Sequence, residues 1–76
     1  MRIPGHPHVS ADPAICGGKP CIAGTRIRVL DVLEMMAGGM TVLEILADYE
    51  QLTEADIRGA LAYAAESQKH PVFVAG

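Results

Sequence analysis

Two cysteines, three histidines and a set of basic side chains near the start are the residues of this chain whose types could do chemistry. Cys16 and Cys21 stand five residues apart, which fits neither the CxxC spacing of a redox pair nor a four-ligand zinc pattern. The histidines lie near the two ends of the sequence, so sharing a metal ion with the cysteines would require chance proximity. We expect free thiols, no metal ion and no cofactor. A metal or redox module built on the two cysteines is the alternative.

The basic side chains gather in the first third of the sequence and the acidic ones follow. Residues 1–28 carry four cationic side chains against one carboxylate, whereas residues 29–76 carry two against eight. Phosphate binding draws mainly on Lys and Arg, so a nucleic-acid contact is expected at Lys19, Arg26 and Arg28. The acidic remainder suits a basic protein partner better. Ordinary solvated charge without any partner is the alternative.

The composition limits the kind of protein to which these residues belong. The chain has 76 residues, half of them apolar, with no Trp and one Phe, which is typical of one small domain with an aliphatic core. Because so short a chain is marginally stable alone, we expect a homodimer or a partner chain. The absence of GxSxG, HExxH and P-loop sequences predicts that the chain is not an enzyme. No apolar run is long enough for a membrane helix, and residues 1–13 lack the apolar centre of a secretory signal, so we expect the cytoplasm.

A β-hairpin opens the expected single domain, which spans residues 9–68 and follows a mobile segment of residues 1–8. The hairpin joins residues 20–22 to residues 26–27 through a turn at Gly24, since glycine accepts a positive φ without steric cost. Residues 8–10 are expected to add a short edge strand. An isolated two-stranded hairpin is not stable in water, so it must lie on the helices.

Three helices are predicted after the hairpin. Apolar residues at helical spacing place the first from residue 28 or 29 to residue 37, where a pair of glycines ends it. Thr41 begins the second, which ends near residue 48, and Thr53 begins the third, which runs to about residue 66 or 68. A carboxylate residue stands three positions after each threonine, which is the pattern of a capping box.

The second and third helices have the spacing of a helix-turn-helix, and an ordinary small helical bundle is the alternative. The helix that reads DNA in such a motif presents Arg, Lys, Asn, Gln or Ser near its N-terminus. Here the first turn of the third helix contains Glu54 and Asp56, whose carboxylates would meet phosphate oxygens badly. This helix is therefore expected to be a poor reader of the major groove.

The outward face of the third helix carries a strip of mostly small residues, namely Ala55, Gly59, Ala62 and Glu66. A glycine inside a helix costs about 1 kcal/mol relative to alanine and often has a packing reason. We expect this strip to be a protein contact, either a dimer seam or a groove for a partner. Short side chains on a tolerant surface are the alternative.

Residues 69–76 form a tail after the helices. Val72, Phe73 and Val74 in this tail are apolar and strand-prone, and we expect them to contact a partner by adding to the edge of its sheet. Docking on the chain's own domain and disorder are the alternatives.

Three sequence pieces together resemble a known family. They are GGKPCIAGTRI, the Gly38-Gly39 break and LTEADIRGAL, and the similarity extends from about Val9 to Glu66. On these pieces the chain resembles the domain of unknown function 433, a family of small prokaryotic proteins grouped with VapB-type antitoxins. The family pattern often has Pro after GTRI, where this chain has Arg28 and an added positive charge.

The resemblance implies a mainly α fold, a homeodomain-like three-helix bundle with an N-terminal β element, and no catalytic residues. It also implies a VapB-like antitoxin of a type II toxin-antitoxin system, which neutralises a PIN-like ribonuclease toxin and binds operator DNA. A dimer would present the hairpins to phosphates while the acidic helical half and the tail engage the toxin. A protein-interaction module that does not bind DNA is the alternative, because the third helix is acidic.

Overall fold

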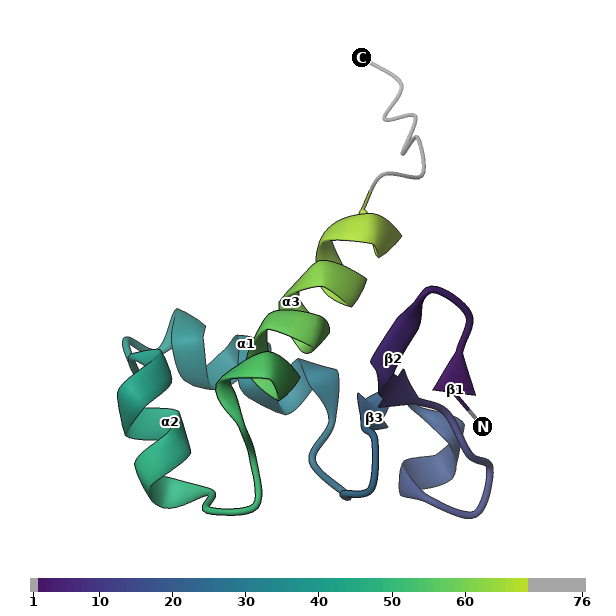
Figure 1. Cartoon of the computed structure of the whole chain (residues 1–76), viewed down its shortest axis with the longest axis horizontal. Coiled ribbons are helices and arrows are strands. Elements are labelled where there is room, and N and C mark those ends of the chain that lie inside the picture. The colour runs from purple at the N-terminus through teal and green to yellow at the C-terminus, as the bar shows by residue number, and fades with distance from the viewer. Residues whose placement is uncertain (1, 69–76) are drawn as a thin grey trace.

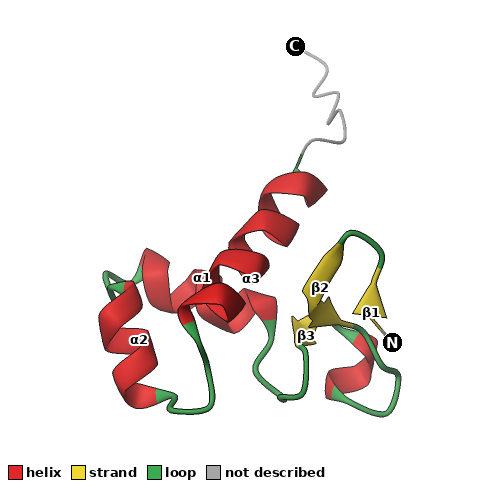
Figure 2. Cartoon of the chain, in the orientation of Figure 1, coloured by secondary structure: helices red, strands yellow, loops and turns green. Residues whose placement is uncertain are grey.

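Residues 2–68 form three helices beside a small three-stranded sheet in the computed structural model (Figure 1). α3 lies between α2 and the sheet (Figure 2). Its contact with β2 is the most extensive between any two elements. The mainly α architecture expected from the sequence is confirmed at this level. The elements are β1 (Arg2–Ile3), β2 (His6–Ser10), β3 (Cys21–Ile22), α1 (Val29–Ala37), α2 (Val42–Asp48) and α3 (Glu54–Ser67).

The helix boundaries follow the predicted caps. The hydroxyl of Thr41 accepts a hydrogen bond from the backbone N–H of Glu44, whose carboxylate accepts one from the backbone N–H of Thr41. Thr53 and Asp56 repeat the same exchange at the start of α3. These reciprocal bonds satisfy backbone donors that have no partner inside the helix. α1 ends before Gly39, whose φ of 102° is a conformation that glycine adopts readily.

The sheet differs from the predicted hairpin. β3 pairs as a strand with β2, with Val9 opposite Ile22, whereas residues 27 and 28 contact β3 without forming a strand of their own. The predicted turn and a short return are present, because the backbone N–H of Thr25 donates to the carbonyl of Ile22 and that of Ile22 donates to the carbonyl of Ile27 over 2.8 Å. Arg28 adds an isolated bridge to Cys21. The return is this short because α1 begins at Val29. β2 is therefore the central strand, not an added edge strand.

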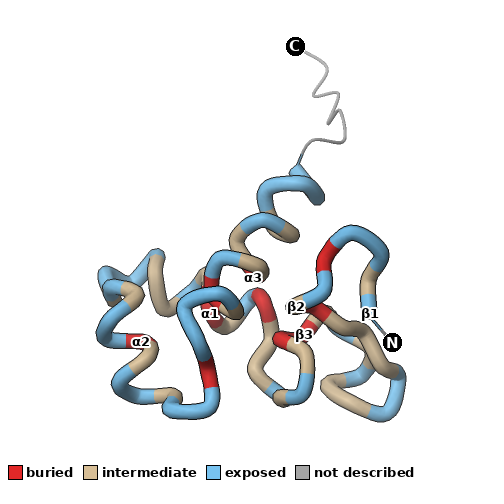
Figure 3. The backbone as a smooth tube through the Cα atoms, viewed as in Figure 1, coloured by how far each residue is buried: buried red, intermediate tan, exposed pale blue. Residues whose placement is uncertain are grey.

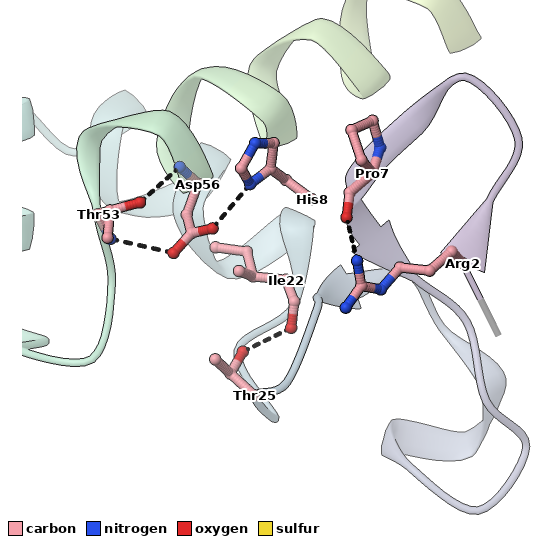
Figure 4. A network of polar contacts seen from close by, with 7 residues as sticks. All are labelled: Arg2, Pro7, His8, Ile22, Thr25, Thr53 and Asp56. Atoms are coloured by element: carbon pink, nitrogen blue, oxygen red, sulfur yellow. Dashed lines mark hydrogen bonds and ion pairs between the residues drawn. The ribbon is translucent and has the colours of Figure 1, made fainter.

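The segment of residues 1–8, expected to be mobile, also needs correction for its described residues. Residues 2 and 3 form β1, and β2 begins at His6. Gly5, with a φ of 82°, lets the chain reverse between the two strands. The guanidinium of Arg2 then donates a hydrogen bond to the carbonyl of Pro7 over 2.8 Å (Figure 4). This short hairpin adds an outer strand to the sheet.

The core is aliphatic, as the composition predicted, and it lies where the helices meet the sheet (Figure 3). All three helices and the strands β2 and β3 contribute at least one buried side chain, so neither the helices nor the sheet form a separate core. The small helical domain therefore depends on the strands to complete its interior. The buried hydrophobic residues of this core are Val9, Ile22, Val29, Val32, Ile45, Leu52, Ile57 and Ala60.

The finer expectation of a homeodomain-like helix-turn-helix is not confirmed and stays a prediction. α2 and α3 follow each other through residues 49–53, as that motif requires. One face of α3, however, is covered by β2 of the same chain. None of the helices within residues 2–68 is long and apolar enough to span a membrane.

Candidate functional site

Two of the three predicted phosphate-binding side chains are exposed on neighbouring loops at the sheet end of the molecule. Lys19 follows the 3-10 turn Cys16–Gly18, and Arg26 lies in the turn that connects β3 to α1. The thiol of Cys16 donates a hydrogen bond to the carbonyl of Arg26 over 3.2 Å, which joins the two loops. The structure therefore brings these two cations to one region of the surface.

Arg28, the third predicted residue, is held by its own helix. Its guanidinium bonds to both carboxylate oxygens of Asp31, at 2.6 Å and 3.2 Å, and its backbone N–H donates to the same carboxylate. The hydrogen bond from the Arg28 side chain lowers the pKa of the Asp31 carboxyl below its usual value. The charge of Arg28 is thus largely compensated inside the chain, and Lys19 and Arg26 carry the local positive charge.

Both thiols are free, and they lie near these loops. Cys21 is buried and donates a hydrogen bond to the carbonyl of Lys19 over 3.4 Å. Burial raises the pKa of the Cys21 thiol to about 11, and the neighbouring Cys16 thiol adds to this effect. The Cys21 thiol is therefore protonated at neutral pH, a state in which it is a poor nucleophile and metal ligand. Within residues 2–68, no three His, Cys, Asp or Glu side chains lie together in a way that could hold a metal ion.

An open groove lies beside the Lys19 loop, between α1 and the C-terminal half of α3. Its volume is about 300 Å³, and its lining is mostly apolar. Leu30 and Leu33 contribute from α1, whereas Tyr63 and Ala64 contribute from α3. The groove therefore places a cationic side chain next to an apolar surface, which none of the sequence patterns predicted.

The predicted small-residue strip on α3 is divided by β2. Ala55 and Ala62 are exposed, but Gly59 lies directly against the strand. A Cβ atom on Gly59 would approach the Cβ of His8 to 2.6 Å, closer than two such atoms can come. The expected packing reason for this glycine is thus found within the chain. Glu66, the fourth residue, pairs with His6 of the same strand.

Two histidine–carboxylate pairs hold β2 on α3. His8 Nδ1 lies 3.0 Å from Asp56 Oδ1 (Figure 4), and His6 Nε2 lies 3.2 Å from Glu66 Oε2. The ring of His6 also meets the ring of Tyr63 edge to face, with centroids 5.3 Å apart. Burial raises the pKa of the Asp56 carboxyl, but hydrogen bonds from the backbone of Thr53 and from His8 outweigh it, so this pKa lies below its usual value.

Comparison with known proteins places the chain in a family. The family model described as "Protein of unknown function (DUF433)" matches residues 9–64. The chain belongs to the DUF433 family. This DUF433 chain is 39% identical over 56 residues to the uncharacterized protein y4eO of Sinorhizobium fredii (strain NBRC 101917 / NGR234). The match covers 74% of the chain, which spans only 25% of the length of that relative.

A solved DUF433 structure has a similar fold. The crystal structure of a DUF433 member protein from Anabaena variabilis ATCC 29413 matches this DUF433 chain with a TM-score of 0.77 and 31% sequence identity. The match covers 80% of the chain and 60% of that protein. The resemblance seen in the hairpin and helix-start sequences is therefore confirmed at the level of family and fold.

The histidines of this DUF433 chain are residues that the sequence prediction missed. His6 and His8 are two positions apart, and side chains at this spacing lie on the same face of a strand. That spacing, together with a glycine inside the third helix, could have indicated a strand that packs its histidines against this helix. It did not lead to a prediction because His6 fell in the segment that was expected to be mobile. The predicted tail contact, at Val72, Phe73 and Val74, lies outside the described residues.

Proposed function

We propose that this DUF433 chain is a VapB-like antitoxin of a type II toxin-antitoxin system, which binds a PIN-like ribonuclease toxin and, as a homodimer in the cytoplasm, operator DNA. The separation of charge within the fold is the observation that carries the proposal. The exposed cations Lys19 and Arg26 lie at the sheet end, whereas α2 and the start of α3 carry exposed carboxylates. Each end thus favours a partner of a different charge.

The acidic end suits a ribonuclease as a protein partner. An enzyme that binds RNA needs a positively charged surface for the phosphate backbone. A surface of carboxylates competes with RNA for those cations and also speeds association at low ionic strength. The exposed carboxylates of this end are Glu44, Asp48, Glu50 and Glu54.

The basic end suits phosphate oxygens, and it requires no base-reading helix. Contacts to phosphates fix the position of a protein on DNA without selecting a sequence. Lys19 and Arg26 lie on loops outside α3, so the acidic first turn of that helix need not face the DNA. The proposal therefore assigns DNA binding to the sheet end.

Three carboxylates that make several hydrogen bonds stabilise the starts of the helices. Asp31, Glu44 and Asp56 each accept hydrogen bonds from the residue that begins their helix. In the proposed function the chain acts by binding and performs no reaction of its own.

A protein-interaction module without DNA affinity is the second candidate. Glu54, exposed in the first turn of α3, favours it because a helix-turn-helix would bring this carboxylate to the DNA. Gel retardation with the DNA upstream of the chain's own gene, at physiological salt, separates the two candidates. An antitoxin that also represses its operon retards this DNA, whereas an interaction module does not.

Charge reversal locates the DNA contact. We expect Lys19→Glu with Arg26→Glu to abolish retardation, because binding through phosphates depends on these cations. Arg58→Glu is the matched control, since this exposed cation lies on α3 at the acidic end and pairs with Glu54 over 3.1 Å. Its retardation should equal that of the unchanged chain. Retardation that survives the double reversal would show that the sheet end is not the contact.

Inhibition of a ribonuclease tests the other half of the proposal. The proposal predicts that a neighbouring gene encodes a PIN-like protein. That protein should cleave RNA alone and lose this activity when an equimolar amount of the chain is added. Glu50→Lys with Glu54→Lys should weaken inhibition, while Lys19→Glu with Arg26→Glu should leave it intact. Cleavage that continues in the presence of excess chain would contradict an antitoxin role.

A further inference from the structure

Two large apolar side chains remain exposed within residues 2–68, and they lie on different helices. Leu30 on α1 is 49% exposed, and Leu43 on α2 is 77% exposed. A single exposed leucine is normal on a protein surface and needs no explanation. Here each leucine belongs to a surface with a definite shape and charge, and the two surfaces are complementary.

Leu30 belongs to the groove between α1 and α3. The volume of about 300 Å³ is roughly ten times the share of one water molecule in liquid water, so the groove has room for a branched apolar side chain. Lys19 contributes to the lining of this groove. No carboxylate within residues 2–68 lies at ion-pairing distance from Lys19. The groove therefore offers an apolar surface with an unpaired positive charge.

Leu43 belongs to a ridge with the opposite charge. Leu43 and Ala47 are exposed one helical turn apart on α2, so they form an apolar column. Glu44 and Asp48, also exposed, form an acidic column beside it. An apolar ridge flanked by carboxylates is the counterpart of an apolar groove flanked by a lysine.

We propose that a second copy of this chain docks its α2 into the groove. Leu43 of one copy enters between α1 and α3 of the other and covers Leu30, while the acidic column faces Lys19. A two-fold axis makes this contact twice, so both exposed leucines of each copy are buried at once. The burial of apolar surface also supports a chain whose own core is small.

This inference rests on the proposed function and deepens its homodimer by assigning its surfaces. In that dimer Arg26 is the cation left for phosphate oxygens, and Glu50 and Glu54 are the carboxylates left for the toxin. It replaces the α3 strip as the dimer contact, because Gly59 and Glu66 of that strip already face β2 of their own chain. Its test uses neither DNA nor a toxin. A failure of the dimer contact is thus distinguishable from a failure of the proposed partners.

Sedimentation equilibrium of the full chain measures the contact directly. We expect the mass of a dimer at high protein concentration and that of a monomer on dilution. Leu43→Glu and Leu30→Glu should each raise the dissociation constant about a hundredfold, as expected for a side chain at the centre of an interface. Both leucines are exposed in the single chain, so the circular dichroism spectrum should not change. Leu43→Ser is a milder variant with the same expected direction.

A matched control and a charge exchange make the assignment specific. Ala62→Glu adds a charge at an exposed position of α3 outside both surfaces, and it should leave the dissociation constant unchanged. Lys19→Glu should weaken the dimer about tenfold, and Asp48→Lys in the same chain should restore most of the loss. Asp48 is chosen because Glu44 caps its own helix.

Three outcomes would overturn the proposal. The first is a monomer of the unchanged chain at millimolar concentration. The second is a dimer that Leu43→Glu and Leu30→Glu leave intact or that Ala62→Glu disrupts, since the seam would then lie elsewhere. The third is an open-ended series of larger species, because a closed two-fold contact stops at two copies.

Discussion

The two sides of α3 are packed by different means. Toward the other helices its contacts are aliphatic, and Ile57 joins a buried cluster with Val32 and Ile45. Toward β2 it presents the close approach at Gly59 and, at either end, a carboxylate that pairs with a histidine. Apolar packing tolerates exchange among residues of similar volume. The polar side depends on particular atoms at particular distances, so it fixes where the sheet lies.

This difference matters for the proposed function because the basic loops are attached to the sheet. β3, which pairs with β2, is followed by the turn that carries Arg26, and Lys19 lies just before β3. The contact between β2 and α3 within the chain therefore sets the position of these cations relative to the acidic helices. Substitutions on the two sides should have different consequences.

The largest effect is expected on the aliphatic side. Ile45→Ala removes a fully buried side chain and leaves a cavity, which should lower the free energy of unfolding by about 2–5 kcal/mol. Urea denaturation followed by circular dichroism measures the loss. Leu43→Ala, on the same helix but 77% exposed, should change the free energy by less than about 0.5 kcal/mol when the chain is dilute enough to be a monomer. Equal losses for the two variants would contradict the assignment of the core.

The next effect tests the close approach of Gly59 on α3 to His8 on β2. Gly59→Leu places atoms where His8 already lies, so β2 must move, and we expect a loss of about 1–3 kcal/mol in the free energy of unfolding. Ala62→Leu on the exposed face of the same helix is the control and should be nearly neutral. A Gly59→Leu chain as stable as the original would mean that the strand does not rest on this helix.

The smallest expected effect is on the pH dependence of the free energy of unfolding. The pKa of the Asp56 carboxyl is lowered in the folded chain, so its ionised form stabilises the fold above the usual carboxyl pKa of about 4, and this contribution disappears as the pH falls through the lowered pKa. Asp56→Asn should therefore cost about 1 kcal/mol at neutral pH, a typical value for a lost cap, and much less in strong acid. Denaturation curves across this pH range measure the difference.

Glu44→Gln provides the comparison for this pH effect. Hydrogen bonds from Thr41 lower the pKa of the Glu44 carboxyl, so the sign of its pH dependence is the same. Glu44 has no histidine partner among the described residues, whereas Asp56 contacts His8. Only Asp56→Asn should also shift the NMR signals of the His8 ring. Identical spectra at His8 would show that the pair adds nothing to the cap.

Local patterns in the sequence were sufficient to predict the helices. The caps at Thr41 and Thr53 depend on residues three positions apart, and the glycine break after α1 depends on two neighbours. These signals involve residues only a few positions apart, so they can be recognised in a single sequence without knowledge of the fold. The same holds for the aliphatic core, which follows from helical spacing and composition.

The sheet and the surfaces could not be predicted in the same way. Which strand pairs with β3 is decided by the burial of Val9 against Ile22, a contact between residues distant in sequence. The ion pair between Arg28 and Asp31 could be predicted only by recognising that Asp31, in the first turn of α1, lies within reach of the Arg28 side chain. Gly59 was recognised as a packing glycine, but its neighbour, His8, lies some fifty residues earlier.

The central claim is that this DUF433 chain binds macromolecules with two oppositely charged ends. Nitrogen-15 NMR spectra of the chain, recorded while short duplex DNA is added at low salt, test it most directly. Chemical shifts should change at the amides around Lys19 and Arg26, stay constant along α2 and at the start of α3, and return to their original values at high salt. Shift changes centred on Glu54, or none at any salt concentration, would contradict the account.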